Sequence, residues 1–295
     1  MSDLAALETL EQPAARPARR RRPAFVLMAL ALYGALVVLG PVLAPYDPAA
    51  ADFFNRLAVP SLAHPMGTDQ LGRDVLSRLL TGFAATPLAA AAVVVLALAG
   101  GGLAGFAAAM AGGLADRALM RLAEALMTLP ALAVALAIAG VLGIGLVTVV
   151  ASLAVVHAAE YARLVRNLVL AEWAATHVFA ARALGVRPVM IAWRHVAPAL
   201  IRPVGTLAAF SFSWAVLSFA GLSFLGLGTP PGASEWGAMI AEARSHMRAH
   251  PNLILAPGLA IVITVLGANL LGDWLGERTA RPFALFIPKS RKDIS

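Results

Sequence analysis

Cysteine is absent from this chain, and the only two lysines, Lys289 and Lys292, lie close to the C-terminus. Without cysteine, the chain has no disulfide bonds and no thiolate metal sites. It also lacks a Gly-x-x-x-x-Gly-Lys-Ser/Thr loop, the usual backbone cradle for nucleotide phosphates. Any ATP hydrolysis linked to this protein must therefore take place in another chain.

Sequence signatures of hydrolytic chemistry are missing too. The chain has no Gly-x-Ser-x-Gly segment, no His-Glu-x-x-His segment and no pair of carboxylates within its apolar runs. The first two patterns mark nucleophilic serines and zinc sites. We therefore expect no catalytic residue, no metal site and no bound cofactor in this chain.

Charge is scarce and apolar sequence is abundant. Charged residues make up 13% of the chain and hydrophobic residues 60%. Several uncharged stretches reach the ~20 residues that a helix needs to cross the hydrocarbon core of a bilayer. Alternating strands are absent, so the sequence predicts an all-α integral membrane protein. The net charge of +7 comes from arginines at the ends of apolar runs, which argues against nucleic-acid binding.

The apolar runs predict six transmembrane helices. The first follows a basic cluster and is longer than a signal-peptide core, so we interpret it as a retained anchor. The third and fourth form one uncharged block that divides at Gly143-Ile-Gly145. The predicted spans are 24–43, 83–111, 122–141, 146–166, 204–224 and 252–272.

The distribution of arginine and lysine predicts the orientation. Of the 23 basic residues, 18 lie in the two tails and in alternate loops, and 5 lie in the remaining loops. Basic residues favour the cytoplasmic side, so both termini are predicted to be cytoplasmic. The resulting organisation is a disordered basic tail (1–23), an anchor helix (24–43), an extracytoplasmic segment (44–82), a five-helix core (83–276) and a cytoplasmic tail (277–295).

Small residues in the second span indicate how it packs. Gly101 and Gly105 are four residues apart, a spacing that lets two helix backbones approach closely. A sliding surface in a gated core is one interpretation, and simple tight packing is the one we favour.

An arginine-rich loop with a short helix is predicted between the fourth and fifth spans, at about 167–198. Helical spacing and a terminal glycine suggest an amphipathic helix that ends at Gly185. Such a helix could present itself to a soluble partner or lie on the lipid surface, and the pattern alone does not separate these alternatives. The residues placed on one side of it are Trp173, His177, Ala180, Ala181 and Leu184.

Three separated motifs resemble the second permease subunit of ATP-binding-cassette (ABC) importers for dipeptides, oligopeptides and nickel. The segment 180–185 followed by 195–198 is similar to the EAA motif of that family. The segments 64–78 (His-Pro-Met-Gly-Thr-Asp-Gln-Leu-Gly-Arg-Asp-Val-Leu-Ser-Arg) and 222–237 resemble further signatures of the same subfamily. Together these matches span residues 64–273.

The resemblance implies a type I ABC importer permease fold with a cytoplasmic coupling helix in the bacterial inner membrane. It also implies partners: a homologous second permease, two cytoplasmic ATPase subunits that use ATP and Mg²⁺, and an extracytoplasmic solute-binding protein. Phe179 stands where many members of the family carry a charged residue, which would make the ATPase contact apolar. The residues implied in ATPase coupling are Phe179, Ala180, Ala181, Arg182, Leu184, Gly185, His195 and Pro198.

Polar residues inside the predicted spans are candidates for substrate contacts. His157 and Glu160 lie three apart on one helical face, where they could contact a cationic substrate or form an internal pair, which we favour. Ser211, Trp214 and Ser218 could line the passage or form bonds between helices, and the sequence does not decide between these roles. His246 and His250, with His64, could form a metal entry site, although no carboxylate or cysteine completes it.

The sequence therefore favours a permease subunit of an ATP-driven, binding-protein-dependent importer for di- or oligopeptides, or for nickel or metal chelates. One alternative is an ion-coupled secondary transporter that uses His157 and Glu160 as a proton relay. Another is a membrane scaffold that transports nothing.

Overall fold

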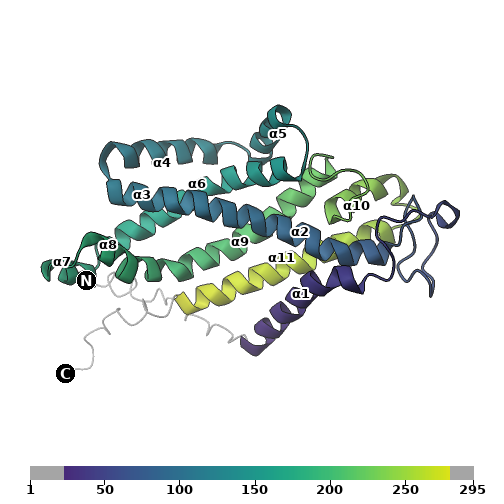
Figure 1. Cartoon of the computed structure of the whole chain (residues 1–295), viewed down its shortest axis with the longest axis horizontal. Coiled ribbons are helices and arrows are strands. Elements are labelled where there is room, and N and C mark those ends of the chain that lie inside the picture. The colour runs from purple at the N-terminus through teal and green to yellow at the C-terminus, as the bar shows by residue number, and fades with distance from the viewer. Residues whose placement is uncertain (1–22, 280–295) are drawn as a thin grey trace, which may run out of the picture.

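The computed structural model describes residues 23–279, and the described chain is helical with a single isolated β-bridge. The all-α prediction is confirmed. The long helices run roughly along one axis, with α7 and α8 at one end of the molecule and α10 at the other (Figure 1). The predicted tails 1–23 and 277–295 lie almost wholly outside the described residues.

Four continuous helices are long and apolar enough to cross a membrane. Two contain a π-helical turn: α2, η2 and α3 form one continuous span, and so do α8, η3 and α9. The elements are α2 Val75–Ala97, η2 Leu98–Gly102, α3 Leu103–Ala111, α6 Leu146–Trp173, α8 Pro188–Ile191, η3 Ala192–Val196, α9 Ala197–Phe224 and α11 Asn252–Thr279.

The span predicted at 122–141 is not one continuous helix. This region is divided between α4 (Gly113–Thr128) and α5 (Ala131–Leu142), which meet at a bend of 97°. Pro130 causes the break, because it has no backbone N–H and holds the preceding residue extended. Leu129 accordingly has φ −85° and ψ 139°.

The first helix, α1 (Pro23–Leu43), is tied to the bundle by Tyr33. Its hydroxyl donates to Thr264 Oγ1 on α11 at 3.0 Å, and its ring meets Phe83 of α2 edge to face. The helix α1 has 21 residues and contains the apolar stretch Leu30–Leu43. By length and composition the described chain has four spans, or five if α4 and α5 count as one. The count of six remains a prediction.

Several helices extend beyond the apolar runs from which they were predicted. The helix α2 begins at Val75 rather than at 83, because Asp74 caps it by accepting a hydrogen bond from the Ser77 N–H at 2.7 Å. Similarly, α6 continues past 166 to Trp173. Polar and charged residues at helix ends hide these extensions from a hydropathy reading.

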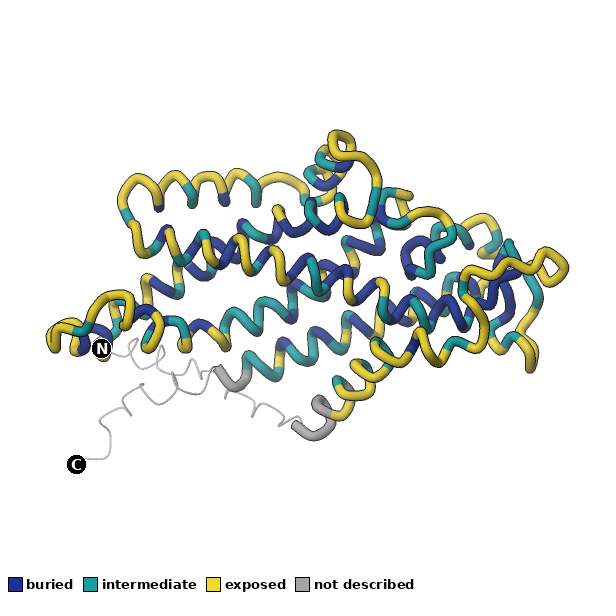
Figure 2. Tube along the Cα trace, viewed as in Figure 1, coloured by how far each residue is buried: buried dark blue, intermediate teal, exposed yellow. Residues whose placement is uncertain are grey.

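The main core lies where α2, α6, α9, α10 (Trp236–Ala243) and α11 meet. Trp236 is fully buried, packs edge to face on Phe83 and donates its Nε1–H to the Leu79 carbonyl at 3.3 Å. Gly82 makes room for it, since a Cβ there would lie 2.4 Å from the indole nitrogen. Buried residues follow the inner sides of the helices, and α1 and α4 are largely exposed (Figure 2).

The glycine pair of the second span packs tightly, as we interpreted it. A Cβ on Gly101 would lie 2.0 Å from the Ala158 carbonyl oxygen, and one on Gly105 would lie 2.1 Å from that of Ala162. The backbones of α3 and α6 are therefore in direct contact, which only glycine permits.

Candidate functional site

The short helix of the arginine-rich loop is α7 (Thr176–Ala183). It ends as predicted at Gly185, whose φ of +76° suits glycine. The Val186 N–H bonds to the Ala181 carbonyl at 3.1 Å, and the Gly185 N–H bonds to the Arg182 carbonyl at 2.9 Å. These two bonds form a Schellman motif, which stops the helix and redirects the chain towards α8.

One side of α7 is buried against the chain itself. Val178 is fully buried and Ala181 is 8% exposed, in a small apolar cluster with Val169, Ile191 and Val196. We expected Ala180 and Ala181 both to admit a partner. The structure separates them: Ala181 faces its own chain and Ala180 is exposed.

Polar contacts fix α7 to the end of α6. The Arg182 guanidinium lies 4.5 Å from the centre of the Trp173 ring, and its Nη2 donates to the Trp173 carbonyl at 3.1 Å. His177 Nε2 lies 3.1 Å from Glu172 Oε1. We had placed Trp173 on the short helix, but it is the last residue of α6. It contacts α7 through Arg182.

α7 also contacts the start of the next span. The rings of His177 and His195 lie 6.0 Å apart, and His195 belongs to η3. Pro198, the other predicted residue of this region, is exposed in the first turn of α9. α7 therefore contacts both α6 and η3.

The free side of α7 is apolar. Phe179 is 71% exposed and Leu184 is 84% exposed, with Arg182 beside them. Exposed apolar residues also occur on α8 and η3, inside the loop predicted at about 167–198, where sequence reasoning singled out only His195 and Pro198. The additional residues are Val189, Met190 and Trp193.

The polar residues inside the bundle do not form a common site. His157 is buried and its Nδ1 lies 3.3 Å from Glu160 Oε2, so the two form an internal pair with each other. Ser211 is buried and Trp214 is 65% exposed, so these two do not face one passage within the chain.

Ser218 is partly buried on the same helix. The serine that joins two helices is Ser213, which donates to Asn269 Oδ1 on α11 at 2.9 Å. Sequence reasoning missed Ser213, because its partner lies on a distant span.

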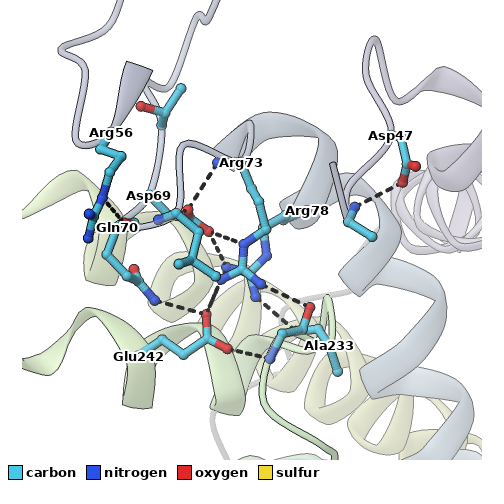
Figure 3. Close-up of polar contacts among 12 residues, drawn as sticks. Asp47, Arg56, Asp69, Gln70, Arg73, Arg78, Ala233 and Glu242 are labelled. Carbon is cyan, nitrogen blue, oxygen red and sulfur yellow. Dashed lines mark hydrogen bonds and ion pairs between the residues drawn. The ribbon is translucent and has the colours of Figure 1, made fainter. Parts of the chain in front are cut away.

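At the opposite end of the molecule, the segment 64–78 forms a buried ionic cluster with α10 (Figure 3). Asp69 Oδ2 pairs with Arg73 Nε at 2.7 Å and with Arg78 Nη1 at 2.6 Å. Glu242 Oε2 pairs with Arg73 Nη2 at 2.6 Å and with Arg78 Nη1 at 3.0 Å. Two carboxylates and two guanidiniums balance, so no net charge is buried.

The same cluster holds the loop between α9 and α10. Arg73 Nη1 donates to the Gly232 carbonyl at 3.2 Å, and Arg78 Nη2 donates to the Ala233 carbonyl at 2.9 Å. Glu242 Oε1 accepts from the Gly232 N–H at 2.7 Å. Burial by itself raises the pKa of Glu242, but Arg78, the Gly232 N–H and Arg73 outweigh it and hold that pKa below the usual value.

The histidines of this end do not assemble a metal site. His64 Nδ1 lies 2.9 Å from Asp74 Oδ1, and His246 Nδ1 lies 3.0 Å from Ser245 Oγ. Within residues 23–279 no group of three histidine, cysteine, aspartate or glutamate side chains is placed to hold a metal ion.

Glu235 is a second buried carboxylate of the α9–α10 region. It caps α10 by accepting from the Gly237 and Ala238 N–H groups, each at 2.9 Å. Burial raises its pKa, while these hydrogen bonds partly oppose the rise.

A bundle of long apolar helices, with a short helix packed at one end and an ionic cluster at the other (Figure 1), is the structure of an integral membrane protein. The chain belongs to the family of binding-protein-dependent transport system inner membrane components, whose model matches residues 100–281.

Relatives in this family are similar over most of their length. The chain is 38% identical to the nickel transport system permease protein NikC of Escherichia coli over 251 residues, which cover 85% of this chain and 91% of that protein. It is 36% identical to the glutathione transport system permease protein GsiD of Pectobacterium atrosepticum over 254 residues, covering 86% and 83% of the two chains.

The chain is therefore a permease subunit of a binding-protein-dependent ABC importer and a multi-pass inner-membrane protein. It is a transport subunit and not an enzyme. Membership of this family implies a partner permease, an ATPase that uses ATP, and a solute-binding protein.

Proposed function

We propose that this chain forms half of the translocation pathway of an importer for small peptides, or for nickel or a metal chelate, and that α7 couples it to an ATPase. The substrate class is supported by relatives named for nickel and glutathione transport. In this proposal both termini and α7 lie in the cytoplasm, which agrees with the 18 basic residues assigned to that side.

The observation that supports the proposal is the way in which α7 packs against the long helices. Its buried side packs on residues from α6 and from the α8–α9 span, and its exposed side carries Phe179 and Leu184. A partner that binds Phe179 and Leu184 can therefore displace the inner ends of both spans together. Nucleotide-driven closure of an ATPase would in this way be converted into rearrangement of the pathway.

The full complex would contain a homologous second permease, two ATPase subunits that hold ATP and Mg²⁺, and an extracytoplasmic solute-binding protein. The other half of the pathway would come from the second permease. Trp214 and Ser218 remain candidates for lining it, because both are accessible in this single chain.

An ion-coupled carrier finds no support in the comparisons. Such a carrier would use His157 and Glu160 as its proton relay. In the structure these two side chains pair with each other, with His157 Nδ1 lying 3.3 Å from Glu160 Oε2.

The absence of cysteine provides a direct test of coupling. Leu184→Cys or Phe179→Cys gives a chain with a single cysteine, to which a photo-activated cross-linker is attached in membranes that contain the whole importer. We expect capture of an ATPase subunit, and we expect nucleotide to change the yield.

The matched control is Val147→Cys, which is 80% exposed near the other end of α6. It should capture no ATPase. Capture of the ATPase from Val147→Cys alone, or from neither end, would contradict the proposal. Uptake assays with dipeptides, glutathione, nickel and nickel chelates then identify the substrate.

A further inference from the structure

A polar cleft of about 370 Å³ lies between α4 and α6, apart from the coupling helix and the ionic cluster. Four arginines and two carboxylates line it. Arg117 and Arg121 are one helical turn apart on α4, and Arg163 and Arg166 are adjacent on one face of α6. The two carboxylates are Asp116 and Glu124.

Only part of this charge is neutralised within the chain. Arg166 forms a bidentate salt bridge with Asp116: its Nε donates to Oδ1 at 2.9 Å and its Nη2 donates to Oδ2 at 2.6 Å. These two charges therefore cancel. Arg117 donates only to the Gly113 carbonyl, and neither Arg121 nor Arg163 has a hydrogen bond or ion pair within residues 23–279. Three cations against Glu124 leave a net charge of +2 facing the cleft.

Exposed apolar side chains lie on the same helix as two of these arginines. α4 begins at Gly113, so Arg117 lies in its first half and Arg121 near its middle. Leu114 and Leu122 of the same helix are 75% and 58% exposed beside the arginines.

We propose that this cleft binds the headgroup of an anionic phospholipid. Arg121 and Arg163 would hold the phosphate by charge-assisted hydrogen bonds, and the acyl chains would lie over Leu114 and Leu122. Asp116 positions Arg166 through the bidentate salt bridge and so shapes the wall of the cleft. In the proposed orientation the site faces the cytoplasmic leaflet, but the binding chemistry does not depend on the substrate of the importer.

A lipid fits better than a soluble anion or an acidic protein surface. A soluble anion would use the arginines but would leave the exposed leucines uncovered. An acidic protein surface would place charged groups against those leucines. A phospholipid satisfies both parts, because it carries a phosphate and apolar chains in one molecule.

The test compares lipid retention by the purified full chain in native mass spectrometry, after delipidation and addition of phosphatidylglycerol or phosphatidylcholine. The variant is Arg121→Gln with Arg163→Gln. Its matched control is Arg244→Gln with Arg248→Gln, two exposed arginines at the other end of the molecule. At about 1 kcal/mol for each arginine near an anionic surface, the variant should retain phosphatidylglycerol about 30-fold more weakly.

A second variant shows whether a loss reflects misfolding. Glu124→Gln removes the opposing charge and should strengthen retention of phosphatidylglycerol. Phosphatidylcholine has a phosphate but no net charge, so its retention should change much less than that of phosphatidylglycerol in each variant.

Three outcomes would overturn the proposal. In the first, the cleft variant and the control retain phosphatidylglycerol equally. In the second, inorganic phosphate or glycerophosphoglycerol without acyl chains competes as well as the lipid, which would indicate a soluble-anion site. In the third, Arg163→Cys in the assembled importer cross-links to another subunit, which would indicate a protein interface.

Discussion

Replacing Glu242 by glutamine removes one of the two carboxylates that neutralise Arg73 and Arg78. Those arginines are only 3% and 2% exposed, so they cannot turn to water when the carboxylate is lost. Asp69 would then face two guanidiniums alone, with a net charge of +1 left in the cluster. Glutamine keeps the size of the side chain and one acceptor oxygen, so the change is mainly one of charge.

The expected cost follows from burial. Removing one partner of a buried ion pair costs about 3–5 kcal/mol. The Glu242 side chain is 17% exposed, and water entering there screens part of the effect. We therefore expect a loss near the lower limit, about 3 kcal/mol in the free energy of unfolding.

The effect should depend on pH in a defined direction. The folded-state pKa of Glu242 lies below its ordinary value of 4.5, so its contribution to stability is fully present above that value. It is lost as the pH falls through the lower folded-state pKa. The difference between wild type and Glu242→Gln should accordingly shrink below about pH 4.5.

The assay is thermal and denaturant unfolding of the purified chain in detergent, with Asp273→Asn as an exposed control that should change stability by less than about 0.5 kcal/mol. Combining Glu242→Gln with Arg73→Gln restores charge balance. The double variant should be more stable than the sum of the single effects predicts, by about 1–3 kcal/mol. Strict additivity, or a Glu242→Gln variant as stable as wild type, would refute the reasoning.

Three further predictions concern the membrane part and the coupling loop. Gly105→Leu should lower stability by about 1–3 kcal/mol in the same assay, because a Cβ there lies 2.1 Å from the Ala162 oxygen; Gly140→Leu, with open space around it, is the control. Gly185→Val should abolish ATP-dependent uptake in vesicles without affecting insertion, because valine resists a φ of +76°; normal uptake would contradict a coupling role. His157→Ala with Glu160→Ala should leave uptake unchanged, because the two side chains bond to each other; lost uptake would restore a transport role.

Much of the membrane architecture could be predicted from the sequence. Long apolar runs located most of the spans, and Gly101 and Gly105 indicated a close helix contact that the structure confirms. The end of α7 at Gly185 was also predictable. These features depend on local spacing or on the conformational freedom of one residue, so they can be read without knowledge of distant contacts.

Other features could not be read in this way. Pro130 stood inside an apolar run that looked like one span, and hydropathy does not record a bend of 97°. Ala181 was expected to face a partner, but it is buried with Val178 of the same helix in a cluster that includes Ile191 of α8. The arginine cleft is formed by α4 and α6 together. Its salt bridge joins Asp116 to Arg166, which are 50 residues apart in the sequence.

The amino-acid sequence by itself determined a helical membrane protein with a short helix in a basic loop, because hydrophobicity, charge and glycine act over a few residues. The permease class came from motifs that resemble a known family. Only the tertiary structure decided which side of α7 is free and which charges are paired. Arg73 and Arg78 meet Glu242 from more than 160 residues away. Such pairs form only when the folded chain removes them from water together, and their partners cannot be read from spacing along the sequence.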